Sequence, residues 1–152
     1  MTEASVLERL RRRLHPATAP LALGALGAVG AVVVHLVDPN EPGFYPTCPW
    51  LALTGTYCPG CGTTRALHAL THLDVLAAAQ LNILLLAALP FMAFAYLRWV
   101  YRSFRPSDRP PARLHPFWAW ALPGVILVFW LVRNLPFGAF LAPGGIPAPL
   151  LA

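Results

Sequence analysis

Charged residues are scarce in this sequence. Only 11% of its 152 residues are charged, whereas 57% are hydrophobic. A soluble domain needs roughly 25% charged residues to cover its water-facing surface. The shortage excludes a conventional cytosolic enzyme, and the abundance of apolar residues excludes an intrinsically disordered chain. Because a few membrane-spanning helices of about 20 residues each would use most of this length, we expect a single membrane domain.

Lysine is absent, and all 11 basic residues are arginines. Most of them lie in two segments beside apolar runs, 1–16 and 98–116. Basic residues that bind nucleic acid would instead cluster with aromatic residues on one soluble face. We therefore interpret the net charge of +5 as a signal of membrane topology, and we expect no nucleic-acid partner.

Three apolar runs are long enough to be candidate membrane spans. They cover residues 21–37, 75–97 and 117–132. The second run follows Asp74, a favourable N-cap, and contains Pro90, which we expect to kink the helix. The tail, residues 133–152, is rich in proline and glycine, so we expect an irregular strap on the membrane surface rather than a fourth regular helix.

The distribution of arginine predicts the orientation of these spans. Four arginines precede the first span and five lie between the second and third, whereas segment 38–73 contains only Arg65. Cytoplasmic loops of membrane proteins carry an excess of basic residues. We therefore expect the N-terminus and the 98–116 loop to be cytoplasmic, and segment 38–73 and the tail to face outward.

All three cysteines lie in segment 38–73, as Cys48 and within Cys58-Pro59-Gly60-Cys61. Proline is favoured at the first position of a helix, so we expect a helix with Cys58 as its N-cap and its thiol at the positive end of the helix dipole. At 100° per residue, such a helix has a polar stripe opposite an apolar side. The stripe consists of Cys61, Arg65, His68 and His72, and the apolar side of Ala66, Leu67, Leu70 and Leu73. The pattern predicts a short amphipathic helix that carries the CxxC motif on the outer membrane surface.

Further short motifs surround the cysteines. They are Cys48-Pro49, Thr54-Gly55, Cys58-Pro59-Gly60-Cys61-Gly62, Thr64-Arg65-Ala66, Asn82 and Arg133-Asn134. This pattern, within residues 44–134, resembles an uncharacterised bacterial family of small integral membrane proteins with a Cys-Pro-x-Cys-Gly-x-Thr-Arg signature. The resemblance implies few helices, a bacterial inner membrane and no assigned activity. The sequence departs from the family at Ile83, because family members usually have proline after the asparagine.

The cysteines allow three interpretations. In the first, Cys58 and Cys61, or Cys48 with one of them, form a structural disulfide, which an oxidising compartment permits. In the second, the three cysteines and one histidine bind zinc, because a CxxC pair with a third cysteine and a histidine fits tetrahedral zinc. In the third, Cys58 attacks a partner disulfide and Cys61 resolves the mixed disulfide.

Helix geometry limits the choice of the histidine ligand. The Cα atoms of Cys61 and His68 would be about 10.5 Å apart on a continuous helix, near the longest span that one zinc ion can bridge. His72 lies one turn further along. We therefore expect His68, and not His72, to complete a zinc site with the cysteines.

Other polar residues lie near the outer ends of the predicted spans. They are His35 and Asp38 at the outer end of the first span, Asn82 near the outer end of the second, and Arg133 and Asn134 at the outer end of the third. Polar residues at membrane boundaries are candidates for function. Together with Arg65, which we expect to offset the negative charge of cysteine thiolates, they predict a shared outward pocket.

These patterns predict an all-α membrane protein with three spans and no catalytic residues. Its outward cysteine loop would be structural, held by a disulfide or zinc, and its partners would be the lipid bilayer and, as a candidate, another membrane protein. The alternative is a membrane thiol–disulfide oxidoreductase that uses Cys58 and Cys61. The sequence contains nothing that resembles a phosphate loop, a serine triad or paired catalytic carboxylates.

Overall fold

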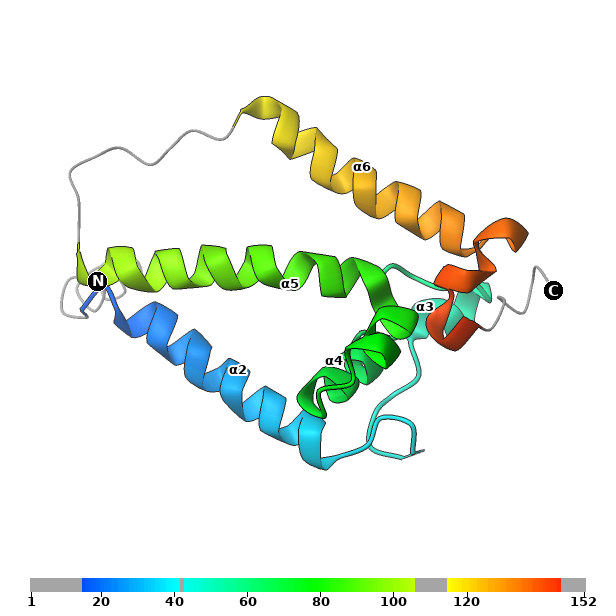
Figure 1. The fold of residues 1–152 in the computed structure, drawn as a ribbon, viewed down its shortest axis with the longest axis horizontal. Coiled ribbons are helices and arrows are strands. Elements are labelled where there is room, and N and C mark those ends of the chain that lie inside the picture. The colour runs from blue at the N-terminus through cyan, green and yellow to red at the C-terminus, as the bar shows by residue number, and fades with distance from the viewer. Residues whose placement is uncertain (1–14, 42, 106–114, 146–152) are drawn as a thin grey trace, which may run out of the picture.

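The computed structural model describes residues 15–41, 43–105 and 115–145, and all regular elements in these ranges are helices (Figure 1). They are α2 (Thr18–Leu36), α3 (Pro49–Thr54), α4 (Thr63–Thr71), α5 (Val75–Phe104), α6 (Pro116–Arg133), and the 3₁₀ helices η1 (Pro136–Leu141) and η2 (Pro143–Gly145). Most of the predicted basic segment 1–16, much of the 98–116 loop and the last part of the tail fall outside the described residues.

Three of these helices, α2, α5 and α6, are long and apolar enough to cross a membrane. The prediction of an all-α membrane protein with three spans is therefore confirmed. As predicted, Asp74 is the N-cap of α5, where its carboxylate accepts a hydrogen bond from the Ala77 amide (2.9 Å). The short helix α3 was not predicted, and the described part of the tail forms two 3₁₀ helices rather than an irregular strap.

The regular geometry of α5 is interrupted at Asn82, whose φ of −159° and ψ of 89° are not helical. At Pro90, where the sequence predicts a kink, the backbone angles stay helical, so the break in regular geometry lies at Asn82 instead. The Oδ1 atom of Asn82 accepts a hydrogen bond from the Leu85 amide (3.1 Å), so the side chain caps the second section of the helix. Ile83 is then the first residue of this section, a position that also suits the proline of the family pattern.

The helices α2 and α6 lie on opposite sides of α5 in Figure 1. Where α2 begins, it meets the last turns of α5, and the Tyr96 hydroxyl donates a hydrogen bond to the Pro20 carbonyl (2.9 Å). The two helices then diverge, and α4 lies between them. At this far end, α3 and η1 lie close to the end of α6, and α4 lies beside the start of α5; we call this the cysteine end.

The spanning helices bury few of their side chains within the protein. Only 6% of the most apolar window of α2 is buried, and the same holds for α6. An apolar groove of about 640 Å³ separates α5 from α6, with Leu84 and Ala87 on one side and Gly124 and Val125 on the other. Such exposed apolar helices suit a lipid environment, in which backbone hydrogen bonds are satisfied within each helix.

Candidate metal centre

The three cysteines converge at the cysteine end. Their Sγ atoms lie within 4.8 Å of one another, and the Cys58 sulfur is 3.6 Å from that of Cys48 and 3.2 Å from that of Cys61. All three are free thiols. These separations exceed the roughly 2.05 Å of a disulfide bond. They are closer to the spacing of about 3.8 Å between two sulfur atoms that share a tetrahedral zinc ion at bond lengths of about 2.3 Å.

Local sequence explains how the first cysteine is placed. Cys48 is the N-cap of α3, and Pro49 takes the first helical position, where its missing amide hydrogen has no cost. Sequence reasoning predicted this role for Cys58, although the Cys-Pro dipeptide occurs at both places. The repeated dipeptide was the signal that would have identified α3.

The residues from Cys58 to Gly62 form a turn before α4, and we call this segment the cysteine turn. The Cys61 amide donates to the Cys58 carbonyl (3.1 Å), and the Cys58 amide donates to the Cys61 sulfur (3.2 Å). The predicted helix that starts at Cys58 and carries the CxxC motif was therefore wrong in its start: α4 begins at Thr63.

Gly62 is the reason why the helix starts late. Its φ of +84° is left-handed, a conformation that other residues rarely adopt. A Cβ atom at this position would lie 2.5 Å from the Leu81 carbonyl oxygen, so the close packing of the cysteine turn on α5 also requires glycine. Because Cys61 lies before this residue, it does not share a helix stripe with Arg65 and His68.

Arg133 at the end of α6 lies directly beneath the cysteine turn. Its side chain is only 1% exposed. Nη1 donates to the carbonyls of Cys58 (2.9 Å) and Pro59 (3.3 Å), and Nη2 donates to that of Cys61 (3.3 Å). The guanidinium also lies over the Phe129 ring, 4.8 Å from its centroid. Among the described residues no carboxylate pairs with it, so a buried positive charge lies next to the thiols.

Two asparagines hold the same stretch of backbone. The amide nitrogen of Asn82 donates to the Pro59 carbonyl (3.0 Å) and to the Thr63 hydroxyl (3.2 Å). Asn134 pairs with both backbone groups of Tyr57, accepting from its amide (2.8 Å) and donating to its carbonyl (2.8 Å). Asn82 and Arg133 therefore contact the backbone of the cysteine turn rather than its sulfur atoms, and Asn134 contacts the residue that precedes it, Tyr57.

The other predicted site residues lie elsewhere. His68 does not join the sulfur atoms, because its Nδ1 is 2.6 Å from the Val34 carbonyl oxygen and its Nε2 faces Asp38. His35 stacks on His72, with ring centroids 4.3 Å apart. Arg65 is partly buried and lines a polar cavity of about 470 Å³ that also reaches Cys48 and Cys61. Its predicted effect on thiolate charge stays a prediction.

The cysteine pKa values are shifted in opposite directions. The hydrogen bond from the Leu51 amide lowers the pKa of Cys48, as expected at a helix N-terminus. Burial raises the pKa of Cys61 from 9.0 to about 12, and only 7% of its surface is exposed. Cys61 therefore stays protonated at neutral pH unless a cation displaces its proton.

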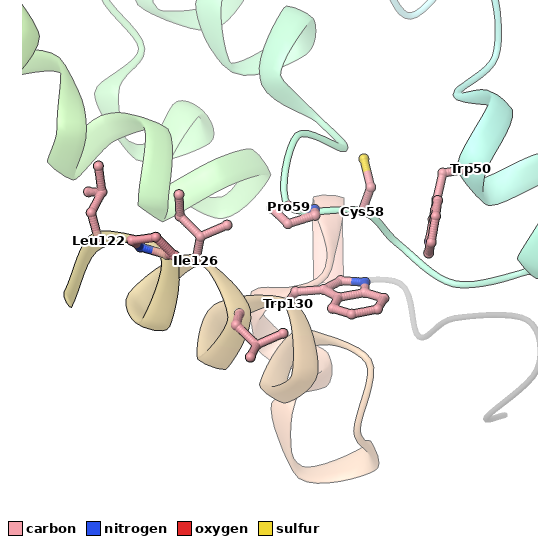
Figure 2. A pocket seen from close by; sticks show the side chains of 8 residues that line it. Trp50, Cys58, Pro59, Leu122, Ile126 and Trp130 are labelled. Carbon is pink, nitrogen blue, oxygen red and sulfur yellow. The ribbon is translucent and has the colours of Figure 1, made fainter. Parts of the chain in front are cut away.

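An apolar cavity of about 570 Å³ adjoins the other side of the cysteine turn. Figure 2 shows Leu122, Ile126 and Trp130 of α6 on one side of it, with Pro59 and Trp50 opposite. The Trp50 and Trp130 rings meet edge to face, with centroids 5.7 Å apart. Cys58 also lines the cavity, so the thiol cluster has a polar cavity on one side and an apolar one on the other. Sequence reasoning predicted a shared outward pocket, and of its predicted polar residues Arg65 lines the polar cavity; it did not predict the apolar cavity.

Residues 48–96 match the model of the family described as Protein of unknown function (DUF2752). The matched stretch begins at Cys48 and includes α3, the cysteine turn, α4 and the break in α5 at Asn82. No curated protein and no solved structure matches this chain significantly.

Proposed function

We propose that this is a non-enzymatic integral membrane protein whose cysteine end is organised by a metal ion, zinc, bound to the thiolates of Cys48, Cys58 and Cys61. The observation that carries the proposal is the convergence of three free Sγ atoms within 4.8 Å. Thiolate ligands select soft or borderline ions, zinc and copper(I) above all.

Charge balance supports a metal ion over a disulfide. Three thiolates and one Zn²⁺ carry a net charge of −1, which the guanidinium of Arg133 neutralises at close range. A disulfide removes negative charge from the cluster and leaves this buried cation, 1% exposed, with only carbonyl groups and aromatic rings around it. Buried charges are costly without an opposite charge nearby, so the thiolate form suits this surrounding better.

The number of cysteines gives independent support. A disulfide would use two of the three thiols and leave one unexplained, whereas a metal ion uses all of them. Tetrahedral zinc takes a fourth ligand. In this proposal a water molecule or a donor from a partner supplies it from the polar cavity, which reaches Cys48 and Cys61.

The proposed ion would link α3 to the cysteine turn, which the side chains of α5 and α6 hold from below. Its role is then structural: it fixes the short segments that join the spans into one rigid surface. Following the distribution of arginine, we place this surface on the outer side of the membrane, where a second membrane protein could dock.

A thiol–disulfide oxidoreductase is the second candidate. It is favoured by the 3.2 Å between the Cys58 and Cys61 sulfur atoms and by the apolar cavity that reaches Cys58. Against it stands the raised pKa of Cys61, because a thiol that stays protonated exchanges slowly.

Metal analysis and intact mass of the protein, purified in detergent without chelator, decide between these candidates. We expect one zinc ion bound to the cysteines, so Cys48→Ser should carry one zinc ion fewer per chain than the unchanged protein, whereas the control Thr47→Val, which changes the neighbouring residue, should carry the same number. A metal-free protein whose mass is two hydrogens below that of the reduced chain would overturn the proposal and favour the disulfide.

A second measurement tests the orientation of the protein in the membrane. After reduction and removal of metal by a chelator, a membrane-impermeant maleimide should label the cysteines in intact cells. Labelling only after lysis would instead place the cysteine end inside the cell.

A further inference from the structure

A second cluster of metal-binding side chains lies at the junction of α2 and α4, away from the cysteines. It consists of His35, Asp38, His68 and His72, which we call the histidine face. The His72 ring stacks on that of His35 at a centroid distance of 4.3 Å and lies 4.4 Å from that of His68. Among the described residues only the three cysteines already bring three ligand atoms together, so a metal ion at the histidine face requires adjustment of the exposed side chains of His35 and His72.

Hydrogen bonds fix the tautomer of two of these histidines. Nδ1 of His68 is 2.6 Å from the Val34 carbonyl oxygen, and Nδ1 of His72 is 3.0 Å from the carbonyl oxygen of His68. A carbonyl oxygen only accepts hydrogen bonds, so both Nδ1 atoms carry the proton. In the neutral rings, each Nε2 then has a free lone pair. Histidines that bind metals have this arrangement, in which one ring nitrogen donates to a carbonyl and the other binds the ion.

The lone pair of His68 faces a second acceptor. Its Nε2 is 3.9 Å from Oδ1 of Asp38. Hydrogen bonds from the Asn40 amide and side chain lower the pKa of Asp38, so this carboxylate is ionised at neutral pH. A neutral imidazole nitrogen and a carboxylate oxygen both carry lone pairs, so this pair is stabilised by a hydrogen-bond donor or a cation between them. A proton on Nε2, a bridging water molecule and a metal ion each fulfil this role, and a metal ion uses both groups as ligands.

We propose that the histidine face binds a divalent transition-metal ion through Nε2 of His68, Nε2 of His72 and the carboxylate of Asp38. Rotation of the exposed His35 ring supplies a fourth ligand. Imidazole and carboxylate ligands suit Zn²⁺, Ni²⁺, Co²⁺ and Cu²⁺, in contrast to the softer thiolate cluster. The ion would join the end of α2 to α4. This site shares no ligand with the proposed cysteine site and does not depend on it.

Cobalt(II) is a probe that separates the two sites in one titration. Thiolate-bound Co²⁺ gives intense sulfur-to-metal charge-transfer absorption in the near ultraviolet, whereas Co²⁺ bound to nitrogen and oxygen does not. The protein, purified in detergent with a histidine-free tag and stripped of metal, is titrated at pH 8, and total bound cobalt is compared with the charge-transfer signal. We expect one equivalent of bound cobalt beyond the equivalent that gives this signal.

Conservative variants test which residues bind that equivalent. His68→Asn and His72→Asn keep an N–H group for the carbonyl that each Nδ1 contacts, and Asp38→Asn keeps an acceptor for the Asn40 amide. Each should weaken binding of the signal-free equivalent at least tenfold and leave the charge-transfer signal intact, which also shows that the fold survives. His115→Asn is the matched control, because His115 caps α6 far along the chain through its own Nδ1. This variant should bind cobalt as the unchanged protein does.

Two results would overturn the proposal. One is a signal-free equivalent that persists in both His68→Asn and Asp38→Asn. The other is a protein that binds no such equivalent at all at millimolar Co²⁺, which would leave a proton or a water molecule between His68 and Asp38. Loss of the charge-transfer signal alone would instead contradict the proposed cysteine site, so the two failures are distinguishable.

Discussion

The cysteine turn and the spanning helices differ in what surrounds their backbone. Carbonyls of the turn accept hydrogen bonds from buried side chains of two other helices, Arg133 of α6 and Asn82 of α5. The helices α2 and α6 leave most of their apolar side chains exposed, and side chains of other helices reach only a few of their carbonyls, among them those of Pro20 and Val34 in α2. The helices are thus joined mainly at one end, by polar contacts.

This difference teaches how the protein is held together. Lipid tails are as apolar as leucine, so burial of apolar side chains gives little driving force for association between spans. A buried hydrogen bond between helices therefore contributes more to the stability of the bundle than the burial of an apolar side chain does. Changes in the cysteine turn should therefore have large effects on stability, and comparable changes in the spans small ones.

The largest effect should come from Arg133→Met. Methionine fills a similar volume but leaves the carbonyls of Cys58, Pro59 and Cys61 without this donor. Because a hydrogen bond to a charged group contributes about 1.5–3 kcal/mol, we expect a loss of about 3 kcal/mol or more in unfolding free energy. We also expect loss of bound zinc. Thermal unfolding in detergent and metal analysis measure the two effects.

Arg98→Met is the matched control, because this arginine lies exposed near the other end of α5. We expect its effect to stay within about 0.5 kcal/mol. Equal losses of unfolding free energy in the two variants would contradict this prediction, since they would show that substitutions at the cysteine end destabilise the protein no more than substitutions in the spans.

Two glycines provide the next contrast. Gly62→Ala places a methyl group on a left-handed residue and against the Leu81 carbonyl, so we expect a loss of about 2 kcal/mol. Gly27→Ala lies inside α2 with no atom within 4 Å of the added Cβ, and we expect no loss or a slight gain. Urea or thermal unfolding of both variants tests this order. A stable Gly62→Ala protein would mean that the turn can move away from α5.

The spans could be predicted from the sequence because composition and length determine them. The predicted run 117–132 differs from α6 by one residue at each end, and Asp74 alone marked the start of α5. The break in the backbone angles of α5 was not predicted, because nothing in the sequence indicates that Asn82 turns its side chain towards the cysteine turn.

The candidate site could be predicted only in part. The gathering of polar residues at one end followed from their positions at the ends of the spans. Their partners did not follow, because nothing in the sequence indicates that Arg133 bonds carbonyls rather than sulfur. The separation of His68 from the cysteines depends on the left-handed backbone of Gly62, which breaks the helix on which the predicted stripe relied.

Two replacements in α5 compare a residue that contacts the cysteine turn, Asn82, with a residue of the exposed span, Pro90. Asn82→Ala removes the donor to Pro59 and the cap on Leu85, and we expect a loss of about 1–2 kcal/mol. Pro90→Ala restores a backbone N–H inside regular helix, so we expect no loss and a gain in stability. Unfolding in detergent measures both. If Pro90→Ala were the more damaging change, the break in α5 would not be the feature that secures the turn.

The smallest predicted effect is a pH dependence of the reduced, metal-free protein. Burial holds the pKa of Cys61 at about 12 in the folded state, above the value of 9.0 for an exposed thiol. The stability that goes with this protonated thiol is complete below pH 9 and is lost as the pH rises towards 12, because the unfolded chain releases its proton first. The lowered pKa of Cys48 has the opposite effect, but its contribution levels off near pH 9.

Between pH 9 and pH 10 we therefore expect a fall in unfolding free energy of about 1 kcal/mol that is due to Cys61. The Cys61→Ala variant corrects for tyrosines and other groups that titrate in this range, so the measured quantity is the difference between the two unfolding curves at each pH. Bound zinc should abolish the fall in unfolding free energy that is due to Cys61, because the metal-bound thiol has already lost its proton. An identical pH dependence in the unchanged protein and Cys61→Ala would show that water reaches this sulfur. The cysteine turn would then be exposed to solvent, and it would no longer differ from the spans in being buried within the protein.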